Sequence, residues 1–165
     1  MDAEELLRRY ATGERDFTGV DLSNANLSRT DLRGINLSRA YLDGANLIDA
    51  NLCGACLSGT HFDVSEMINT DLRQANLSGS DLSADLSGAN LSGADLNRAD
   101  LYSASLENAL LIETDLSYTK LEAAVFEGAN LSYANLTGST DADVNNAILY
   151  HTIMPNGSIV SNDHN

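Results

Sequence analysis

The only two cysteines of this sequence form a motif with known chemistry. Cys53 and Cys56 are the ends of a CxxC segment, and the nearest histidine is His61. Such a segment forms a redox-active disulfide in thioredoxin-like proteins, or supplies two thiolate ligands to zinc. Neither setting is present, because the chain has no second cysteine pair and no alternation of strand and helix patterns. Incidental surface thiols are therefore the favoured interpretation. A redox role through a disulfide, or a zinc site completed by His61, is kept as the third functional hypothesis, after the two that are given below.

The histidines and serines do not form a pattern that is typical of an enzyme. His61, His151 and His164 lie in separate parts of the chain, and many of the serines stand at regular positions of a repeat. Nucleophilic catalysis needs a nucleophile, a base and a group that orients the base, all within hydrogen-bond reach. No such set stands out, so the sequence favours a non-catalytic protein that needs no cofactor and no metal.

Composition restricts the partners and the compartment. The 165 residues amount to one domain, with a net charge of −15 from 24 acids and 9 bases. This excess of acids disfavours nucleic acid and anionic membrane as direct partners, and it allows a basic protein surface. The opening Met1-Asp2-Ala3-Glu4-Glu5 lacks the features of a signal peptide, and no apolar run reaches transmembrane length. We expect a cytoplasmic protein with reduced cysteines.

The charge is uneven along the chain. Residues 1–82 carry 13 acids and 7 bases, which gives a net charge of −6. Residues 83–165 carry 11 acids and only 2 bases, Arg98 and Lys120, which gives −9. The second half is therefore the more acidic.

A repeat of five residues positions all of these side chains. It is visible in Ala25-Asn26-Leu27-Ser28 and in Ala75-Asn76-Leu77-Ser78-Gly79. Each unit has a small residue, then Asn or Asp, a central Leu, a polar residue and often Gly. The 28 central residues run in step from Phe17 to Leu82 and from Leu86 to Leu136, and end with Val144, Leu149 and Met154.

A period of five fits neither a helix face, which repeats every 3.6 residues, nor a simple strand, which repeats every two. If each unit turns the chain by about 90°, four units form one coil and every central residue points inward. The Leu then fills the lumen, and the small residue two positions earlier leaves room for it. The remaining polar residues face outward or form the corners. Stacked coils pair their backbone groups, and 28 units give about seven coils.

The sequence resembles the pentapeptide-repeat family, whose motif is A(D/N)LXX. The resemblance covers residues 15–155 and implies an all-β fold, a right-handed quadrilateral β-helix. The opening Glu5-Leu6-Leu7-Arg8-Arg9-Tyr10 and the closing Ile153-Met154-Pro155-Asn156-Gly157-Ser158 are similar to cyanobacterial members of the family.

The first coil of such a solenoid needs a cap, because its backbone groups would otherwise be unpaired. Asp2, followed three residues later by Glu5, predicts the start of a helix. An apolar stripe of Leu6, Leu7 and Tyr10 continues the helix, which should end before Gly13. We expect residues 1–14 to form a short N-terminal helical cap.

The other end of the chain has no helical pattern. Pro155-Asn156-Gly157 predicts a turn that folds Ile159 and Val160 over the last coil, and residues 161–165 should be loose. We therefore expect the solenoid to span residues 15–155, and residues 156–165 to form a C-terminal cap and loose tail.

Two spacings interrupt the repeat. Leu82 and Leu86 are four residues apart, one fewer than the period. Leu136 and Val144 are eight apart, which we interpret as one unit lengthened by three residues. Both irregularities are expected to be slack that the corners absorb.

Acids gather on two of the four predicted walls, which we number from the unit of Phe17. On the second wall Asp21, Asp81, Asp100 and Asp143 precede the central residue, Asp43, Asp63 and Glu122 follow it, and the third wall adds Asp85, Glu107 and Glu127. Seven coils form a rod that is roughly 34 Å long. DNA carries one charge per about 1.7 Å, so DNA of this length carries about 20 charges, which compares with a net charge of −15 on this chain.

Some pentapeptide-repeat proteins resemble B-DNA in shape and charge, and they inhibit or protect DNA gyrase by occupying its DNA site. The resemblance therefore implies an alternative function, a DNA-mimic modulator of DNA gyrase or another topoisomerase. Two departures weigh against it, since this sequence shows neither the C-terminal dimerisation helix nor the projecting loops of such members. Asp before the central Leu is also half of the family motif.

At several outward positions where the repeat has a polar residue, this chain has an apolar one. Most of these positions lie in the last three coils, and the numbering from Phe17 places them on the third and fourth walls. They are Leu110, Ile112, Val125, Ile148, Tyr150 and Ile153. Exposed apolar patches often mark partner surfaces, although residues 139–142 and 156–160 could equally cover this one. We expect a binding or scaffold protein, monomeric or weakly dimeric, that meets an unknown protein partner through its outer walls.

Overall fold

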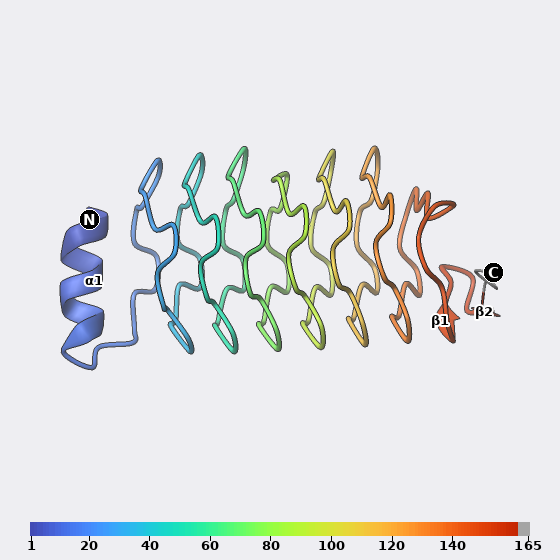
Figure 1. The fold of residues 1–165 in the computed structure, drawn as a ribbon, viewed down its shortest axis with the longest axis horizontal. Coiled ribbons are helices and arrows are strands. Elements are labelled where there is room, and N and C mark those ends of the chain that lie inside the picture. Colours follow the sequence, from blue (N-terminus) through green and yellow to red (C-terminus); the bar gives the residue numbers. More distant parts are fainter. Residues whose placement is uncertain (162–165) are drawn as a thin grey trace.

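The computed structural model describes residues 1–161, which form a rod of stacked coils with a helix at one end (Figure 1). Helix α1 spans Ala3–Ala11, and two short strands, β1 (Thr152–Ile153) and β2 (Ile159–Val160), lie at the opposite end. Between them the coils are joined by isolated parallel bridges, because the chain turns after only a few residues in every unit. No helix in this part of the chain is long and apolar enough to cross a membrane.

The bridges form four ladders, one for each wall. The first members are Asp16 with Asn36, Asp21 with Tyr41, Asn26 with Asn46, and Asp31 with Asn51. Each pair is 20 residues apart, which is the length of four units. The N–H of each central residue donates to the adjacent coil, as Leu27 does to the Asn46 carbonyl at 2.8 Å. The coils above and below thus satisfy the backbone groups that a period of five leaves without a helix.

The lumen is filled by the central residues of successive units. Leu27, Leu37 and Leu47 are fully buried, and Phe62 and Met67 take the same place in two other units. The small residue two positions before the centre is also buried in most coils. At several such positions a Thr hydroxyl donates to a carbonyl in the neighbouring coil; the bonds include Thr60 to Leu37, Thr70 to Leu47 and Thr114 to Leu91. Thr30 and Thr119 instead donate within their own coil, to Leu27 and Leu116. The predicted inward positions are therefore confirmed.

Side-chain hydrogen bonds explain why Asn or Asp precedes the central residue. The side-chain oxygen of Asn26 accepts the backbone N–H of Ser28 at 3.1 Å, and Asp115 accepts that of Ser117 at 2.9 Å. This Asx-type contact holds the chain in the turn that follows each Leu. The residue two positions after the centre has a positive φ, as Asn24 does (60°). This conformation favours Gly or Asn at that position.

Helix α1 closes the first coil as the sequence predicts. The Asp2 carboxylate accepts the N–H of Glu5 at 2.8 Å, and the helix ends before Gly13. Leu6 is fully buried, and Leu7 and Tyr10 pack against the core from the helix. The apolar stripe therefore covers the end of the lumen.

The opposite end is closed by a hairpin. A turn at residues 154–158 pairs Thr152 with Val160 and Ile153 with Ile159, and the Gly157 N–H donates to Met154. Val160 packs against the core, but Ile159 remains 67% exposed. The expectation that both residues fold over the last coil is right for Val160 and wrong for Ile159. Residues 162–165, which the predicted loose tail includes, lie outside the described residues.

The first irregular spacing is absorbed as expected. The N–H of Ala84 donates to the Leu82 carbonyl at 2.7 Å, which forms a tighter corner than elsewhere. Bridges that cross this corner join residues 19 apart, as in Asp71 with Asn90, and later bridges return to a separation of 20. The ladders continue without a break.

The interpretation of the second irregular spacing is wrong. Lys120 bridges Thr140, the Gly128 N–H donates to Asn146, and Asn130 bridges Ile148 only 18 residues further on. Residues 137–144 therefore hold two units, one of the usual five residues and one of only three, instead of one lengthened unit. The additional unit has Asp141, an exposed residue, where the other units have an apolar centre.

The additional unit places each later unit on the next wall. Asp143 lies on the third wall instead of the second, beside Asn145 and Asn146. Ile148 and Tyr150 lie on the fourth wall instead of the third, and Ile153 lies on the first wall, where it bridges Asn135.

Candidate functional site

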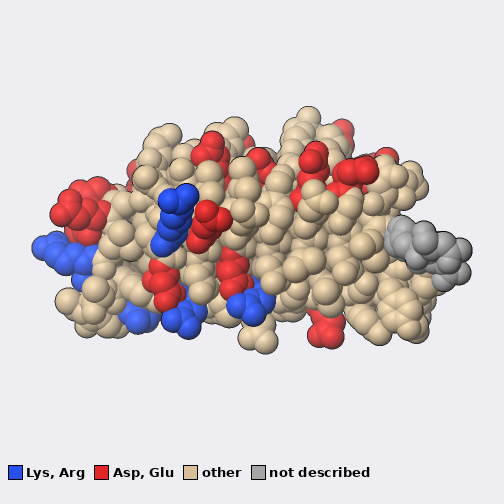
Figure 2. Space-filling view, viewed as in Figure 1, with Lys and Arg blue, Asp and Glu red and all other residues tan. Residues whose placement is uncertain are grey.

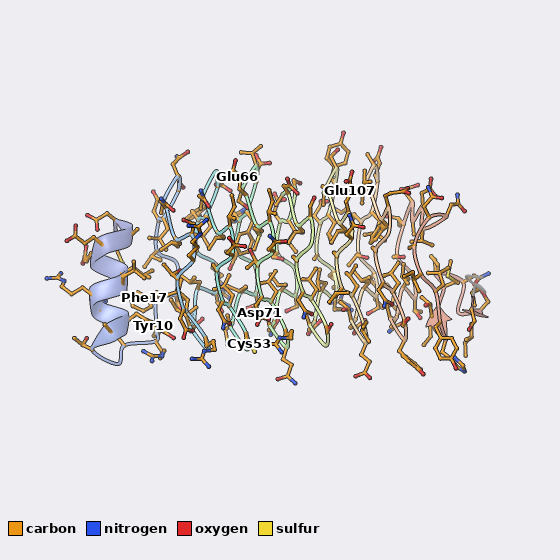
Figure 3. All side chains as sticks on the ribbon, in the orientation of Figure 1. Tyr10, Phe17, Cys53, Glu66, Asp71 and Glu107 are labelled. Atoms are coloured by element: carbon orange, nitrogen blue, oxygen red, sulfur yellow. The ribbon has the colours of Figure 1, made fainter. Side chains whose placement is uncertain are left out.

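The two cysteines lie on different walls. Cys53 is half-buried on the fourth wall and follows Leu52, whereas Cys56 is exposed on the first wall, where it bridges Asn36. Both are free thiols, and Figure 3 shows Cys53 close to Asp71 at the lower edge of the view. The corner between the two walls separates the outward side chains of the motif.

His61 does not join the cysteines. It lies on the second wall, where its ring stacks on that of Tyr41 with the centroids 5.0 Å apart and an angle of 7°. Among residues 1–161, no group of three His, Cys, Asp or Glu side chains could hold a metal ion. His164 lies outside the described residues, and the zinc hypothesis gains no support.

The predicted acidic surface occupies the second and third walls. Asp81 bridges Asp100 on the second wall, and the N–H of Asp63 donates to the Asp43 carboxylate at 3.1 Å. On the third wall, Glu107 and Glu127 occupy equivalent positions in adjacent coils. Figure 2 shows acids along the upper edge for much of the rod, and Figure 3 places Glu66 and Glu107 there. The acids are thus stacked in like-charged pairs.

Little of this charge is neutralised within the molecule. Of the ten acids in the predicted surface, only Asp100 has an ion pair in the described chain, with Lys120 at 2.7 Å. The backbone N–H of Ser23 donates to the Asp21 carboxylate, its hydroxyl adds a second bond, and together they hold the pKa of Asp21 below its usual value. These hydrogen bonds favour the charged form of Asp21.

The basic side chains lie elsewhere. On the face in Figure 2, Lys and Arg gather over the N-terminal half of the rod, and the C-terminal half carries acids without bases. Several arginines pair with acids of their own unit or helix, as Arg33 does with Asp31 and Arg73 with Asp71. The uneven charge of the sequence is therefore an uneven charge of the surface.

The predicted apolar patch divides between walls. Leu110 and Ile148 belong to one ladder of the fourth wall, two coils apart with Asn130 between them. Each is 39% exposed, and Tyr150 beside them is 48% exposed. Ile112 follows the central residue on the same wall and is half-buried. We call Leu110, Ile112, Ile148 and Tyr150 the fourth-wall patch.

Val125 and Ile153 do not belong to this patch. Val125 lies on the third wall, where it lines a hollow of about 160 Å³ beside the shortened unit with Glu127 and Asp143. Ile153 lies on the first wall, half-buried within β1. Val125 is on the wall that the sequence predicts, whereas Ile153 was predicted on the fourth wall because the unit at Asp141 was not recognised.

Two aromatic residues that the sequence analysis missed extend the fourth-wall patch. The rings of Tyr133 and Tyr150 meet edge to face with centroids 5.4 Å apart, and His151 lies 5.6 Å from Tyr133 and 4.4 Å from Tyr150. Tyr133 and His151 have positive φ values of 61° and 50°, at the corner position that favours Gly. An aromatic residue is uncommon in that conformation, and this is the signal that could have identified them.

A shallow groove adjoins the patch on its N-terminal side. It arises because Ser92 and Gly93 offer little side chain between longer neighbours in the adjacent coils. The groove has a volume of about 440 Å³ and is lined by Cys53, Arg73, Gln74, Ser92, Gly93, Ile112 and Glu113.

The chain is similar to several proteins of known structure. HetL, a pentapeptide repeat protein of the cyanobacterium Nostoc sp. strain PCC 7120 involved in heterocyst differentiation regulation, is 27% identical; the match covers 97% of this chain and all of HetL, with a TM-score of 0.49. Rfr23 from the cyanobacterium Cyanothece 51142 is 27% identical over 73% of this chain and 92% of its own, with a TM-score of 0.49. QnrB1, a plasmid-mediated fluoroquinolone resistance protein, is 23% identical over 87% and 86%, with a TM-score of 0.47. No curated protein matches the chain.

The family described as Pentapeptide repeats matches most of the solenoid. Its profile occurs in eight copies, over residues 16–49, 45–83, 83–117 and 109–149. These are the residues whose backbone forms the four ladders. The chain therefore belongs to the pentapeptide-repeat family, whose known structures are right-handed β-helices.

Proposed function

We propose that this chain is a non-catalytic binding or scaffold protein that meets a protein partner through its fourth wall. The observation that carries this proposal is the exposure of Leu110, Ile148 and Tyr150 together on one wall. In the proposal, residues 15–155 form a four-sided rod of about seven coils in the cytoplasm, and residues 1–14 and 156–165 close its ends.

The construction of the rod favours an outer surface as the site of action. Leucine side chains fill the lumen, so the interior leaves no room for a substrate. Apolar area that a partner covers contributes about 25 cal/mol per Å², and patches of this kind often mark protein interfaces. Ladders hold each wall in one conformation, so little conformational entropy is lost on binding.

A paired substitution on the patch tests the proposal. Leu110→Asp with Ile148→Asp should abolish retention of a partner in affinity capture, because it places charge at the centre of the apolar surface. Val64→Asp with Tyr102→Asp is the matched control, since both residues are exposed and lie on the second wall. Size-exclusion chromatography with light scattering shows whether the partner is a second copy. Equal retention by both variants would contradict the proposal.

The acidic walls support a second candidate, a DNA-mimic modulator of DNA gyrase or another topoisomerase. The supporting observation is the stacking of acids such as Asp43 with Asp63 and Glu107 with Glu127, none of which has an ion pair in the described chain. The net charge of −15 compares with about 20 charges on DNA of the same length.

A gyrase supercoiling assay at two salt concentrations tests this candidate. A mimic should inhibit at micromolar protein and lose potency as salt screens its charges. Asp63→Asn with Glu107→Gln should weaken that inhibition, whereas the fourth-wall substitutions should not. Supercoiling that is unaffected at either salt concentration would eliminate this candidate.

A further inference from the structure

The C-terminal end of the fourth wall combines exposed aromatic rings with an acid. The corner positions of successive coils are Gly93, Glu113, Tyr133 and His151, stacked through the bonds from Gly93 N to Ile112 O (2.9 Å), Glu113 N to Ser132 O (3.0 Å) and Tyr133 N to Tyr150 O (2.7 Å). The exposed carboxylate of Glu113 therefore lies one coil from the ring of Tyr133. Tyr150 and His151 complete the ring cluster in the following coil.

This corner has no Lys or Arg of its own. Within residues 1–161, Glu113 forms no ion pair, and Lys120 is bound to Asp100 on the second wall. Arg98 lies at a corner of the first wall, where its N–H donates to Ser117. Residues 83–165 carry a net charge of −9, from 11 acids and 2 bases. The local field therefore attracts cations.

The N-terminal end of the same molecule shows what such rings accept. There the Arg15 guanidinium lies 3.8 Å from the ring centroid of Tyr10, and that of Arg9 lies 5.3 Å from the centroid of Phe17. Arg9 also pairs with Glu14, so one guanidinium contacts both a ring and a carboxylate. At the C-terminal end the ring and the carboxylate are present without the cation.

We infer that the corner of Glu113, Tyr133, Tyr150 and His151 binds an arginine side chain from an extended basic segment of the protein partner. This inference rests on the proposed function and specifies the chemistry of the partner. The guanidinium would lie on the exposed face of Tyr133 or Tyr150 and bond the Glu113 carboxylate with two of its N–H groups. Its aliphatic stem would pack on Ile112.

The adjoining groove gives this segment a path along the wall. Ser92 and Gly93 leave space for a peptide backbone next to Ile112 and Glu113. At the far side of the groove, Arg73 is held by two hydrogen bonds to Asp71, at 2.8 and 2.6 Å, and its charge is compensated. A basic segment would thus meet apolar, aromatic and acidic groups in succession, with no exposed uncompensated base in its way.

Fluorescence anisotropy with a defined probe tests the inference on the full chain. The probe is a labelled octapeptide of alternating glycine and arginine, and the comparison peptide has citrulline, which has nearly the same shape without the charge, in place of arginine. We expect Tyr133→Ala with Tyr150→Ala to weaken binding of the arginine peptide about tenfold, and Glu113→Gln about threefold to tenfold. Citrulline should reduce binding at least as much.

The matched control separates ring recognition from general attraction to an acidic protein. Tyr41→Ala with Tyr102→Ala removes two tyrosines of comparable exposure from the second wall and should leave the affinity unchanged. Circular dichroism checks that each variant is folded, and Glu113→Gln preserves the shape of the corner. Equal losses in the two tyrosine pairs, or equal binding of the citrulline peptide, would overturn the inference.

The outcome is independent of the test of the proposed function. Suppose that the Leu110 and Ile148 substitutions abolish partner capture but the Tyr133 and Tyr150 substitutions leave the peptide affinity unchanged. The inference then fails and the proposed function stands. If the Leu110 and Ile148 substitutions leave partner capture unchanged, the proposed function fails, whatever the affinity for the arginine peptide.

Discussion

The ring of Tyr118 lies so close to Gly138 in the next coil that a Cβ atom on Gly138 would stand 2.7 Å from its Cδ1 and Cε1 atoms. Gly138 also has a φ of 70°, which side chains rarely adopt. The glycine thus provides both the backbone conformation of this corner and the space that the tyrosine ring occupies.

Replacing this glycine should cost more than replacing a glycine at an open corner. Gly79 has a φ of 64° and nothing within 4 Å of its Cβ position, so Gly79→Ala should lower the free energy of unfolding by about 1–2 kcal/mol. Gly138→Ala should cost about 1 kcal/mol more, because the ring must move. Urea unfolding measures both, and adding Tyr118→Ala should remove the difference. Equal costs in the presence of the ring would contradict this account.

Two buried serines predict stability changes of opposite sign. The Ser65 hydroxyl has no hydrogen-bond partner in the described chain, whereas the Ser80 hydroxyl donates to the Leu77 carbonyl at 2.7 Å. Ser65→Ala should therefore raise the free energy of unfolding by about 1 kcal/mol, and Ser80→Ala should lower it by about as much. Thermal unfolding of the two variants provides the comparison. Destabilisation by both would show that Ser65 has a partner.

The helical cap should protect mainly the coil that it covers. Leu6 is the buried residue on the inner face of α1. Leu6→Ala should therefore weaken the packing of the helix on the first coil by about 2–5 kcal/mol. Because a solenoid unit contacts only its neighbours, amide exchange should accelerate at Phe17 and Leu22 and stay unchanged at Leu72. Arg8→Ala, on the exposed side of the helix, is the control. Uniform acceleration along the rod would mean that the coils unfold together.

Acid should destabilise the rod through carboxylates that the fold holds ionised. The Arg73 side chain donates to Asp71 and holds the pKa of that carboxyl below its ordinary value of 3.8. A lowered pKa adds stability that is present above the unfolded value and is lost as the pH falls through the folded value. The Tm should therefore fall below about pH 4, and Asp71→Asn should reduce that slope. An unchanged slope would show that Asp71 contributes nothing to it.

Other carboxylates contribute in the same direction. Hydrogen bonds from neighbouring side chains and backbone amides lower the pKa of Glu14, Asp16, Asp21 and Asp31. The acid transition should thus remain visible, though weaker, after any single substitution.

The five-residue repeat predicted the lumen and the corners. A Leu every five residues can be buried only if the chain turns once in each unit, and this requirement places Leu27 and Leu47 on one wall. The pattern from Asp2 to Tyr10 likewise predicted a helix, because its capping group and apolar stripe are both local. The features that could be predicted are therefore those that depend on the five-residue period or on contacts between residues close in the sequence.

The rest depended on a residue that gives no signal in the pattern. Asp141 occupies a central position without an apolar side chain, so the spacing from Leu136 to Val144 suggested one unit where the bridges show two. That error moved Ile148 to the wrong wall and hid its alignment with Leu110. Tyr133 was missed for a different reason, because corner residues are the most variable of the repeat and only the fold shows which of them stack.

The shortened unit at Asp141 changes the surface of the rod without interrupting its core. Had residues 137–144 formed a single unit, Ile148 would share a wall with Val125, and Ile153 would take its place in the ladder of Leu110. Insertion or deletion of one repeat therefore acts as a rotation, turning every later side chain to a new face while each Leu remains inside. In such a molecule, the number of repeats can generate new combinations of surface residues as effectively as point substitution, and at less risk to folding.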